Sequence, residues 1–430
     1  MARKKVLVIS YYWPPAGGAG VQRVVKFVKY LPHFGYDPVV LTVKKGEYPT
    51  YDESLLQDIP KEVEVVKTKT LEFFRLFKMF TGRSQKKGLP TTLLKREASS
   101  GWERLFRWIR YTLFLPDARV GWKPYAVRAG MKLIRKHHPE IIFCTSPPHS
   151  VQIIGQSLHR RTGIPWVADF RDPWTDAFWL WELPNYPRAY RRNINLEKEI
   201  IGEANAVVTV SEGFSEVLKK VDRPIEVITN GYDEESFTGY QKRSNKKFSI
   251  VYTGTLSKTQ HPGNLLCALE ELCVHEGLDI QFDLYGAIDE YFTAEVRRLG
   301  LESVVKEHGY IPYSEAVQRM FDADMLLLLS PRTEMRGITP QKIFEYMATE
   351  NFVLGIGSPD DDPARILREC EAGVYVDFSD DIRGVLRERY EAWKTPGQAF
   401  APTQEKVKQY TRKALTGKLA SVFDKVLINK

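Results

Sequence analysis

Cysteine is scarce in this sequence, with only four among its 430 residues. They stand apart along the chain, without a C-x-x-C pair, at Cys144, Cys267, Cys273 and Cys370. Such a pattern excludes a disulfide framework, and no grouping of histidines and cysteines has the spacing of a zinc site. We therefore expect no structural metal of this kind and a reducing, cytoplasmic setting.

Long apolar stretches are also missing. The longest uncharged apolar runs, such as Met325–Leu329, have five residues, whereas a helix that spans a membrane needs about 20. The charged start Met1–Lys5 is followed by Val6–Ser10, which is too short for the apolar part of a signal peptide. These absences predict a chain that does not cross a bilayer.

The composition is that of a globular protein. Hydrophobic residues make up 43% of the chain and charged residues 27%, which provides enough apolar side chain for a core and excludes a disordered or low-complexity chain. A length of 430 residues exceeds that of most single domains, so we expect two domains.

Positive charge is concentrated in one stretch. The formal net charge is +8, yet Lys67–Lys136 alone holds 18 basic and four acidic residues, so the rest of the chain is net negative. Aromatic residues accompany the basic ones, and Glu103–Phe114 is predicted to form a helix that carries both. This combination suits an anionic membrane surface. A solvated basic face whose aromatics pack on the domain core is the open alternative, and we expect no nucleic acid because no recognised binding motif is present.

The first half of the chain alternates strands with helices. Lys5–Ser10 predicts a strand, a loop rich in proline and glycine follows, and apolar residues at helical spacing lead to a second strand at Pro38–Thr42. This order forms a βαβ unit and implies a parallel sheet. Beyond the basic stretch the predicted strands and helices are Ile141–Thr145, Ser150–Thr162, Trp166–Asp169, Ala206–Val210, Ser211–Lys220 and Ile225–Thr229.

A break in the pattern at Asn230–Asp233 and the polar run Thr238–Lys247 predicts the domain boundary. The alternation then starts again, with predicted elements at Phe248–Tyr252, Pro262–Glu276, Ile280–Tyr285, Ser314–Ala323, Met325–Leu329, Gln341–Thr349, Phe352–Ile356 and a final helix at Thr403–Leu427. The sequence therefore predicts two consecutive doubly wound α/β halves.

Ligands of doubly wound sheets bind beyond the carboxyl ends of the strands. The turn after the first strand contains Gly17, Gly18 and Gly20, which either let the backbone approach a ligand or simply form a tight turn. In the second half, Gly254–Lys258 follows a strand and combines a glycine with hydroxyls and a lysine. This turn suits a diphosphate, although a lone surface lysine is the plain alternative for Lys258.

A segment before the helix at Gln341–Thr349 is more informative. Thr339 is a candidate N-cap with Pro340 at the first helical position. Lys342 and Glu345 are three residues apart and share one face of the predicted helix. They are candidates for holding an anionic ligand, and an ordinary salt-bridged helix is the alternative.

Three further signals are weaker. Asp322 and Asp324 resemble a D-x-D metal motif, but they lie between a helix and a buried strand, and Asp360–Asp362 precedes Pro363 as the start of a helix. We expect no metal at either place. His149 follows a strand end and could face a cleft, or it could be a structural histidine.

Several of these segments together resemble a retaining glycosyltransferase of the large family four, which has the GT-B fold. The segments are YYWPPAGGAGVQRVVKFVKYL, VVTVSEGFSEVL, VITNGYDEESF, YTGTLSKTQHPGNLLCALEEL, LYGAIDEYF, HGYIPYSEAVQRMFDADMLLLLSP and ITPQKIFEYMATENFVLGIGSPDDDPARIL. The resemblance covers nearly the whole chain apart from the basic stretch. It implies two Rossmann-like domains that face a cleft, with a C-terminal helix that crosses back to the first domain.

The expected domains follow from this resemblance. Residues 1–235 would form an acceptor domain that carries the basic aromatic insert at about 67–136. Residues 236–402 would form the domain that binds the nucleotide-sugar, and residues 403–430 would return to the first domain.

The resemblance also implies donor-binding residues. Glu345 matches the second glutamate of the family's E-x7-E motif, which holds the nucleotide ribose, but the first glutamate falls on Gly337. Contacts to the donor sugar would then come from backbone amides around Ile338–Gln341, with help from Glu334 or Arg336.

The diphosphate and the base would be held by other segments. The family's paired arginine and lysine fall on Thr255 and Gln260, so Lys258 or Lys342 would have to substitute for them. The turn around Ile311 matches the place where backbone groups read the base.

In the first half, VADFRDPWTD places Arg171 and Asp172 where many relatives carry a functional histidine. The RDPW variant resembles a subgroup that acts in the assembly of bacterial surface polysaccharides. Asp172 would orient the acceptor hydroxyl and Arg171 would offset charge on the diphosphate. The alternative is a buried structural ion pair between the two.

The implied activity is transfer of a sugar from a nucleotide diphosphate sugar to an acceptor hydroxyl, with retention and without a bound metal or other cofactor. A lipid-linked or saccharide acceptor at the inner face of the membrane is the expected partner. Two rival functions use the same fold: a nucleotide-sugar 2-epimerase and a non-catalytic subunit. The long basic insert argues against the epimerase, and the broken E-x7-E motif keeps the non-catalytic subunit open.

Overall fold

The computed structural model describes residues 3–48, 50–71, 112, 114–177, 185–395, 400 and 402–429. It divides the chain into two compact units, Met1–Thr229 with Leu415–Lys430, and Asn230–Ala414. The expected boundaries at residues 235 and 402 therefore shift. The segment 230–235 and residues 403–414 both belong to the second unit, because the backbone of Tyr232 hydrogen-bonds to the chain around Tyr410 and Arg412.

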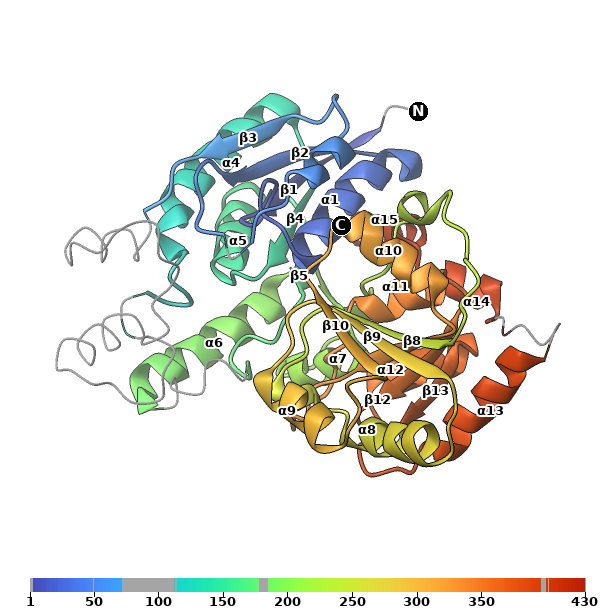
Figure 1. Ribbon diagram of the computed structural model, residues 1–430. Helices are drawn as coiled ribbons and strands as arrows, with labels where there is room; N and C mark the ends of the chain where they lie inside the picture. Colours follow the sequence, from blue (N-terminus) through green and yellow to red (C-terminus); the bar gives the residue numbers. More distant parts are fainter. Residues whose placement is uncertain are drawn as a thin grey trace. The chain divides into compact units, whose positions relative to one another are not determined.

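The first unit is built on a seven-stranded sheet of parallel strands in the order β3-β2-β1-β4-β5-β6-β7 (Figure 1). Its strands are β1 (Lys4–Ser10), β2 (Tyr36–Val43), β3 (Val65–Thr68), β4 (Ile141–Ser146), β5 (Trp166–Phe170), β6 (Ala206–Thr209) and β7 (Glu226–Val227). The order reverses between β1 and β4, which is the topological switch point of a doubly wound sheet.

Helices cover both faces of this sheet. They are α1 (Ala19–Tyr30), α4 (Lys123–His137), α5 (Ser150–Thr162), α6 (Pro187–Glu203), α7 (Glu212–Leu218) and α15 (Arg412–Ile428). Alternate residues of β1 point to opposite faces. Val6 and Val8 pack in the core with α1 and α15, whereas Leu7 and Ile9 pack in the core with α4 and α5.

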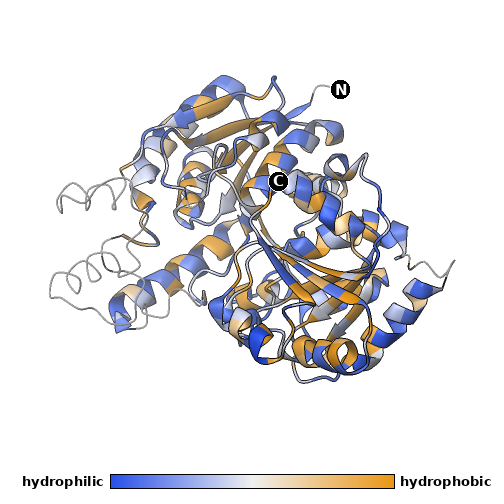
Figure 2. Ribbon diagram, viewed as in Figure 1, coloured by the Kyte–Doolittle hydropathy of each residue, from blue (hydrophilic) through white to orange (hydrophobic). Residues whose placement is uncertain are grey.

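The second unit has a six-stranded parallel sheet in the order β10-β9-β8-β11-β12-β13. Its strands are β8 (Phe248–Thr253), β9 (Ile280–Tyr285), β10 (Val305–Gly309), β11 (Met325–Leu329), β12 (Phe352–Ile356) and β13 (Gly373–Val376). Its helices are α8 (Gly263–Leu269), α9 (Glu290–Arg298), α10 (Tyr313–Asp322), α11 (Lys342–Ala348), α12 (Asp362–Cys370), α13 (Arg383–Lys394) and α14 (Gln404–Lys408). Apolar residues are concentrated on the strands and on the helix faces that cover them (Figure 2).

The predicted fold class is confirmed: both halves are doubly wound α/β units. The helix at Ser150–Thr162 and the strands Ile280–Tyr285, Met325–Leu329 and Phe352–Ile356 have the predicted bounds. The single final helix is wrong, since α14 ends at Lys408 and α15 starts at Arg412. The helix is interrupted between Lys408 and Arg412 because the backbone there bonds to another segment. Tyr410 O accepts a hydrogen bond from Tyr232 N, and Arg412 N donates one to Tyr232 O.

The predicted helix Glu103–Phe114 and most of the basic stretch lie outside the described residues. Within the part of the chain that the structure describes, no helix is both long and apolar enough to span a membrane.

Candidate active site

In the second unit, the ammonium of Lys342 lies against the turn that follows β8. A Cβ atom built on Gly254 would be 2.6 Å from Lys342 Nζ, so only a glycine lets the lysine approach the backbone this closely. The same Nζ lies 4.1 Å from the centre of the Tyr252 ring, in a cation–π contact. Burial lowers the pKa of Lys342 to about 8, and the nearby Glu345 opposes this shift. A cation is thus held at the carboxyl end of the central strand, where phosphates bind in this type of fold.

Glu345 lies on the same helix and is held by two neighbours. Its Oε1 accepts hydrogen bonds from Gln341 Nε2 (3.4 Å) and Tyr313 Oη (3.3 Å). Gln341 Oε1 in turn accepts a hydrogen bond from Arg412 Nη2 (3.2 Å). Burial raises the pKa of Glu345, while Gln341, Arg412, Tyr313 and Lys342 partly counter the increase. The carboxylate is therefore fixed in position as an acceptor, as a group that holds ribose hydroxyls must be.

The loop before α11 differs from its predicted structure. The helix begins at Lys342 with Gln341 as N-cap, so Thr339 is not the N-cap. Ile343 N donates a hydrogen bond to Pro340 O, which closes a turn there instead. The Thr339 hydroxyl is buried and makes no hydrogen bond within the described chain. An unpaired hydroxyl in this loop is available to a ligand.

Gly337 occupies the position where the family has its first glutamate. Its φ of 87° is in the left-handed region, which a glutamate would adopt only with strain. Its N–H donates to Asp361 Oδ1 over 2.8 Å, which ties the loop to the start of α12. Among the described residues, the backbone N–H groups of Ile338 and Thr339 make no hydrogen bond. These N–H groups remain candidates for hydrogen bonds to the sugar of the nucleotide-sugar, as the resemblance implied.

The other candidates for donor binding in the second unit make contacts that do not involve Lys342. Lys258 is exposed, with its Nζ 5.5 Å from the centre of the Tyr291 ring. The side chain of Gln260 is engaged in structural hydrogen bonds. Its Nε2 donates to Leu329 O at the end of β11, and its Oε1 accepts from Ser257 Oγ. Thr255 is exposed and its carbonyl accepts from Tyr252 Oη. Of the two lysines offered for the diphosphate, Lys342 is the one whose ammonium lies against Gly254.

Ile311 packs partly buried against the core below α10 and α11. Its neighbour Tyr310 is 89% exposed. The backbone role expected for this turn stays a prediction.

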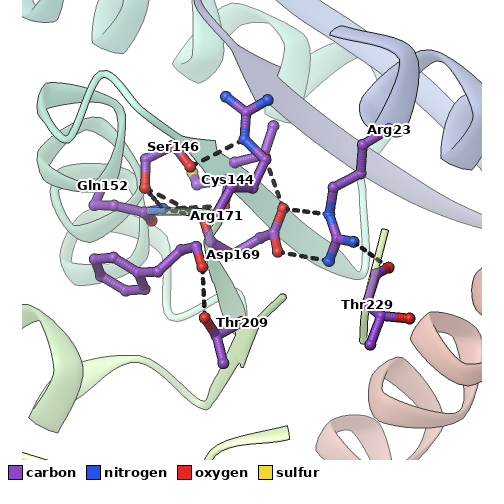
Figure 3. Close-up of polar contacts among 10 residues, drawn as sticks. Arg23, Cys144, Ser146, Gln152, Asp169, Arg171, Thr209 and Thr229 are labelled. Atoms are coloured by element: carbon purple, nitrogen blue, oxygen red, sulfur yellow. Dashed lines mark hydrogen bonds and ion pairs between the residues drawn. The ribbon is translucent and has the colours of Figure 1, made fainter. Parts of the chain in front are cut away.

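The first unit contains a buried ion pair beneath its glycine loop (Figure 3). The guanidinium of Arg23 on α1 contacts the carboxylate of Asp169 on β5, with Nη2–Oδ1 at 3.0 Å and Nε–Oδ2 at 3.3 Å. Both side chains are fully buried. Asp169 also accepts from Thr145 Oγ1 (2.7 Å), and Arg23 Nη1 donates to Thr229 O (2.7 Å). The hydrogen bonds of this pair connect α1, β4 and β5 with Thr229, the last residue of the segment Met1–Thr229.

Arg171 follows β5 and turns back over the strand ends. Its Nε donates to Ser146 O (3.0 Å) and its Nη2 to Pro147 O (2.8 Å). A Cβ atom on Gly20 would lie 1.7 Å from its Nη1, so the guanidinium occupies the space that Gly20 leaves open at the start of α1. Nη1 has no hydrogen-bond partner in the described chain. The predicted ion pair of Arg171 with Asp172 is not the main contact, since carbonyl oxygens hold the guanidinium.

Gly17 and Gly18 shape the loop at the end of β1. Gly17 N donates to Thr50 O (3.0 Å), and Gly18 O accepts from Val21 N and Gln22 N at the start of α1. Gly17 packs on Asp52, where a Cβ atom would lie 3.0 Å from Asp52 Cβ. The loop is therefore braced on a neighbouring loop, and its role toward the donor stays a prediction.

His149 and Asp172 lie near the same strand ends. His149 is buried and stacks on Trp174, with ring centres 5.0 Å apart and planes at 2°. Burial lowers the pKa of His149 to about 3, so the ring is neutral at physiological pH. Its Nδ1 has no partner among the residues described. Burial raises the pKa of Asp172, and Arg171 opposes this effect.

The two carboxylate motifs serve the backbone. Asp322 accepts from Arg243 N and Gln318 Nε2, and Asp324 from Ser249 N and Asn245 Nδ2. Asp361 is the N-cap of α12. In the described residues, no three histidine, cysteine or carboxylate side chains are grouped to hold a metal ion.

The contacts that join distant segments could not be predicted from the sequence. Arg23 stands inside an apolar helical pattern, and a buried basic residue in such a pattern is a signal for a buried partner. The partner Asp169 is 146 residues away, however, and no local pattern identifies it. Tyr313 and Arg412 were missed for the same reason.

Solved structures with the same arrangement are glycosyltransferases. Sucrose-phosphate synthase from Thermosynechococcus elongatus matches over 100% of both chains with a TM-score of 0.61 and 14% identity. HepE from Anabaena, in complex with UDP and glucose, matches over 98% of this chain and 100% of its own, with a TM-score of 0.60 and 13% identity. A TarM variant from S. aureus, in complex with fondaparinux, α-GlcNAc-glycerol and UDP, has a TM-score of 0.60 and 12% identity over 98% of this chain and 100% of its own. At these identities the likeness defines the fold, which is GT-B.

The sequence itself identifies the family. Residues 16–236, just over half of the chain, match the protein family described as Glycosyltransferase Family 4. No curated protein sequence gave a match. The chain belongs to glycosyltransferase family 4, and it is an enzyme that transfers a glycosyl group.

Proposed function

We propose that this glycosyltransferase moves a sugar from a nucleotide diphosphate sugar to an acceptor hydroxyl, with retention at the anomeric carbon. The observation that carries the proposal is the pair formed by Lys342 at the Gly254 turn and Glu345 one turn along the same helix. A cation for the diphosphate and a fixed carboxylate for the ribose are the two groups that a nucleotide donor requires.

The nucleotide we expect is UDP, since the similar structures of HepE and TarM were both solved with UDP. The leaving group is a nucleoside diphosphate. Negative charge develops on it as the bond between the anomeric carbon and the diphosphate oxygen breaks. Lys342, with the N–H groups of Ile338 and Thr339, would stabilise that charge without a metal ion. Arg171 would offset further charge, and Asp172 would orient the acceptor hydroxyl.

For the acceptor we propose a lipid-linked or saccharide hydroxyl in the synthesis of a cell-surface polysaccharide or glycolipid. The RDPW variant at Arg171–Trp174 supports this role, as does the basic excess of Lys67–Lys136. An acceptor carried by a membrane lipid would bring the enzyme to the inner face of the membrane as a peripheral protein.

A donor screen tests the proposal. Purified protein is incubated with UDP-, GDP- and dTDP-sugars in the presence of EDTA, and nucleotide release is measured with and without a membrane extract. We expect release from a UDP-sugar, faster when the extract supplies the acceptor, and the NMR spectrum of the product gives its anomeric configuration. No release under any of these conditions would contradict the donor assignment and favour a non-catalytic role.

Site variants then locate the donor. Lys342→Ala and Glu345→Ala should each weaken UDP binding by about tenfold or more, as expected for loss of a hydrogen bond to a charged group. Lys258→Ala is the matched control, because the ammonium of this lysine lies over the Tyr291 ring rather than against Gly254. Unchanged affinity in both site variants would remove these residues from the donor site.

A further inference from the structure

The first unit has a cationic hollow on its surface, between α4 and the end of α5. Its volume is about 600 Å³, which is within the range of pockets that bind small ligands. Its basic residues are Lys123, Arg128, Arg135 and Arg161. Its apolar residues are Pro124, Val127 and Met131. The hollow therefore combines positive charge with an apolar floor.

The helical spacing of α4 puts these groups on one face. Lys123, Val127, Met131 and Arg135 follow one another at intervals of four residues, so they form one stripe along the helix. Gly130 lets α4 pack closely on α5, since a Cβ atom there would lie 2.7 Å from Leu158 Cδ1. This close packing brings Arg161, in the last turn of α5, to the same hollow.

Among the residues that the structure describes, the positive charges in the hollow have no counter-ion. Lys123, Arg128 and Arg161 make no ion pair with any residue that the structure describes, and Arg135 donates only to Met131 O of its own helix. Burial, together with the charges of Arg161 and Arg160, lowers the pKa of Lys123. By contrast, Arg160 is paired with Glu199 and Glu203. Like charges held together in this way favour an anionic ligand.

A favourable contact with the carbonyl end of α5 would explain a basic residue in its last turn, such as Arg161. It does not explain Lys123 and Arg128, which lie in the first half of α4. Nor does it explain the apolar floor, where Val127 is buried and Met131 is half-buried. A small inorganic anion would leave this floor unused.

Six of the seven residues that line the hollow, Lys123–Arg135, belong to the basic stretch Lys67–Lys136. Leu71 N donates to Gly121 O over 3.4 Å, two residues before α4 begins at Lys123. Leu71 is a large apolar residue and is 53% exposed. An exposed apolar side chain therefore lies close in the chain fold to the start of α4.

We propose that this hollow binds the phosphate head group of an anionic membrane phospholipid, with the upper part of an acyl chain on Pro124, Val127 and Met131. The proposal deepens the membrane location in the proposed function. Lipid binding is measured without donor or acceptor, and transfer is measured without lipid, so failure of one is distinguishable from failure of the other.

Short-chain lipids below their micelle concentration test the site directly. Calorimetric titration of the full-length protein compares dihexanoyl-phosphatidylglycerol, dihexanoyl-phosphatidylcholine and inorganic phosphate. We expect saturable binding of the phosphatidylglycerol and binding that is weaker by about tenfold or more for the other two. Equal binding of inorganic phosphate would show a simple anion site and overturn the lipid assignment. Equal binding of phosphatidylcholine would show that the charges play no part.

Charge reversal identifies the residues. The triple variant Lys123→Glu, Arg128→Glu and Arg161→Glu should bind the phosphatidylglycerol at least about 100-fold more weakly, because three charges are reversed. The control triple variant Arg297→Glu, Arg368→Glu and Lys408→Glu changes the net charge equally at exposed positions of the second unit, and it should bind as the unchanged protein does. Unchanged binding by the first variant, or equal loss by the second, would overturn the proposal.

Two more measurements keep the test independent of folding. The single variant Arg128→Glu changes an exposed side chain only, and it should lower phosphatidylglycerol affinity by several-fold while circular dichroism stays unchanged. Met131→Gln should weaken the phosphatidylglycerol and leave the weak binding of inorganic phosphate as it is. Equal effects of Met131→Gln on both ligands would show that no acyl chain contacts the floor.

Discussion

The guanidinium of Arg171 fills the space beside Gly20, so that a Cβ atom on Gly20 would lie 1.7 Å from Nη1. The arginine comes from the loop after β5 and the glycine from the first turn of α1, so the contact joins the end of a strand to the start of a helix. The carbonyls of Ser146 and Pro147 hold the other nitrogens of the guanidinium. The position of Nη1 therefore depends on the absence of a side chain at Gly20.

Replacing Gly20 with alanine tests this dependence. The added methyl group must displace the guanidinium, and a displacement of about 1 Å in a catalytic group lowers a rate by about 100-fold. We expect Gly20→Ala to lower kcat for transfer by about this factor, with unfolding free energy reduced by no more than about 1–3 kcal/mol.

The control for Gly20 is Gly202→Ala. Gly202 lies within α6, and a Cβ atom there would meet nothing within 4 Å. This change should leave kcat unaltered and stabilise the helix by about 0.5–1 kcal/mol. Full activity of Gly20→Ala would show that the position of Arg171 does not matter for transfer.

The charge on Lys342 should make donor binding depend on pH. Its pKa of about 8 in the free enzyme means that the side chain is cationic below this pH and neutral above it. Only the cation attracts a diphosphate, so affinity for UDP should fall as the pH rises through about 8, and binding should take up protons in this range. Titration calorimetry in buffers of different ionisation enthalpy measures both effects.

Removing the titrating group removes the pH dependence. Lys342→Met should bind UDP more weakly at neutral pH, with little change in affinity up to about one pH unit above 8. Lys258→Met is the comparison, since the ammonium of Lys258 lies over the Tyr291 ring rather than against Gly254, and this variant should keep the pH dependence of UDP affinity. If UDP affinity of Lys342→Met still falls as the pH rises through about 8, the titrating group is another residue.

A substitution at Thr339 should change UDP-sugar affinity without lowering the unfolding free energy. Its buried hydroxyl has no partner within the described chain, so Thr339→Val should leave the unfolding free energy unchanged or slightly higher. If the hydroxyl bonds the donor, UDP-sugar affinity should fall by about three- to tenfold, as for one neutral hydrogen bond. Isothermal titration and thermal unfolding of the same preparation give both values.

Thr349→Val should show the opposite pattern. Thr349 Oγ1 donates to Tyr346 O (2.8 Å) and accepts from Asn351 N (3.4 Å). Losing these bonds should lower the unfolding free energy by about 1–3 kcal/mol and leave donor affinity unchanged. A stability loss in Thr339→Val like that in Thr349→Val would mean that the Thr339 hydroxyl is structural.

The buried pair Arg23–Asp169 should be a major contributor to the stability of the first unit. Arg23→Met leaves the Asp169 carboxylate buried without its partner, which should lower the unfolding free energy by about 3–5 kcal/mol. The exposed pair Lys425–Glu226, at 2.9 Å, provides the comparison. Lys425→Met should change stability by no more than about 1 kcal/mol. Chemical denaturation measures both, and similar small losses would show that Arg23 is dispensable.

The alternation of strands and helices could be predicted because its signals are local. Leu7, Ile9 and their neighbours form a short apolar run, and apolar residues on α1 recur at helical spacing. The edge strand β10 was missed, since four of its five residues are exposed and it has no alternating pattern. The end of α14 was missed because its cause is Tyr232, which lies far away in the sequence.

The candidate site was predicted in part. Lys342 and Glu345 lie on one short helix, so their spacing alone indicated that they act together. The choice of Lys342 over Lys258 needed the structure, because each lysine follows a turn of suitable composition. Thr339 was assigned as an N-cap from residue type, but the helix begins three residues later.

By itself, the sequence determined the fold class, the two halves and the family, since periodicity, turn residues and motif order are properties of neighbouring residues. Only the tertiary structure decided which distant groups meet: Arg23 with Asp169, Arg171 with Gly20, and Lys342 with Gly254. In a parallel sheet with helical crossovers, strands far apart in the chain end at the same edge. Contacts at that edge depend on strand order and on the space that each glycine leaves open, and no local pattern records either.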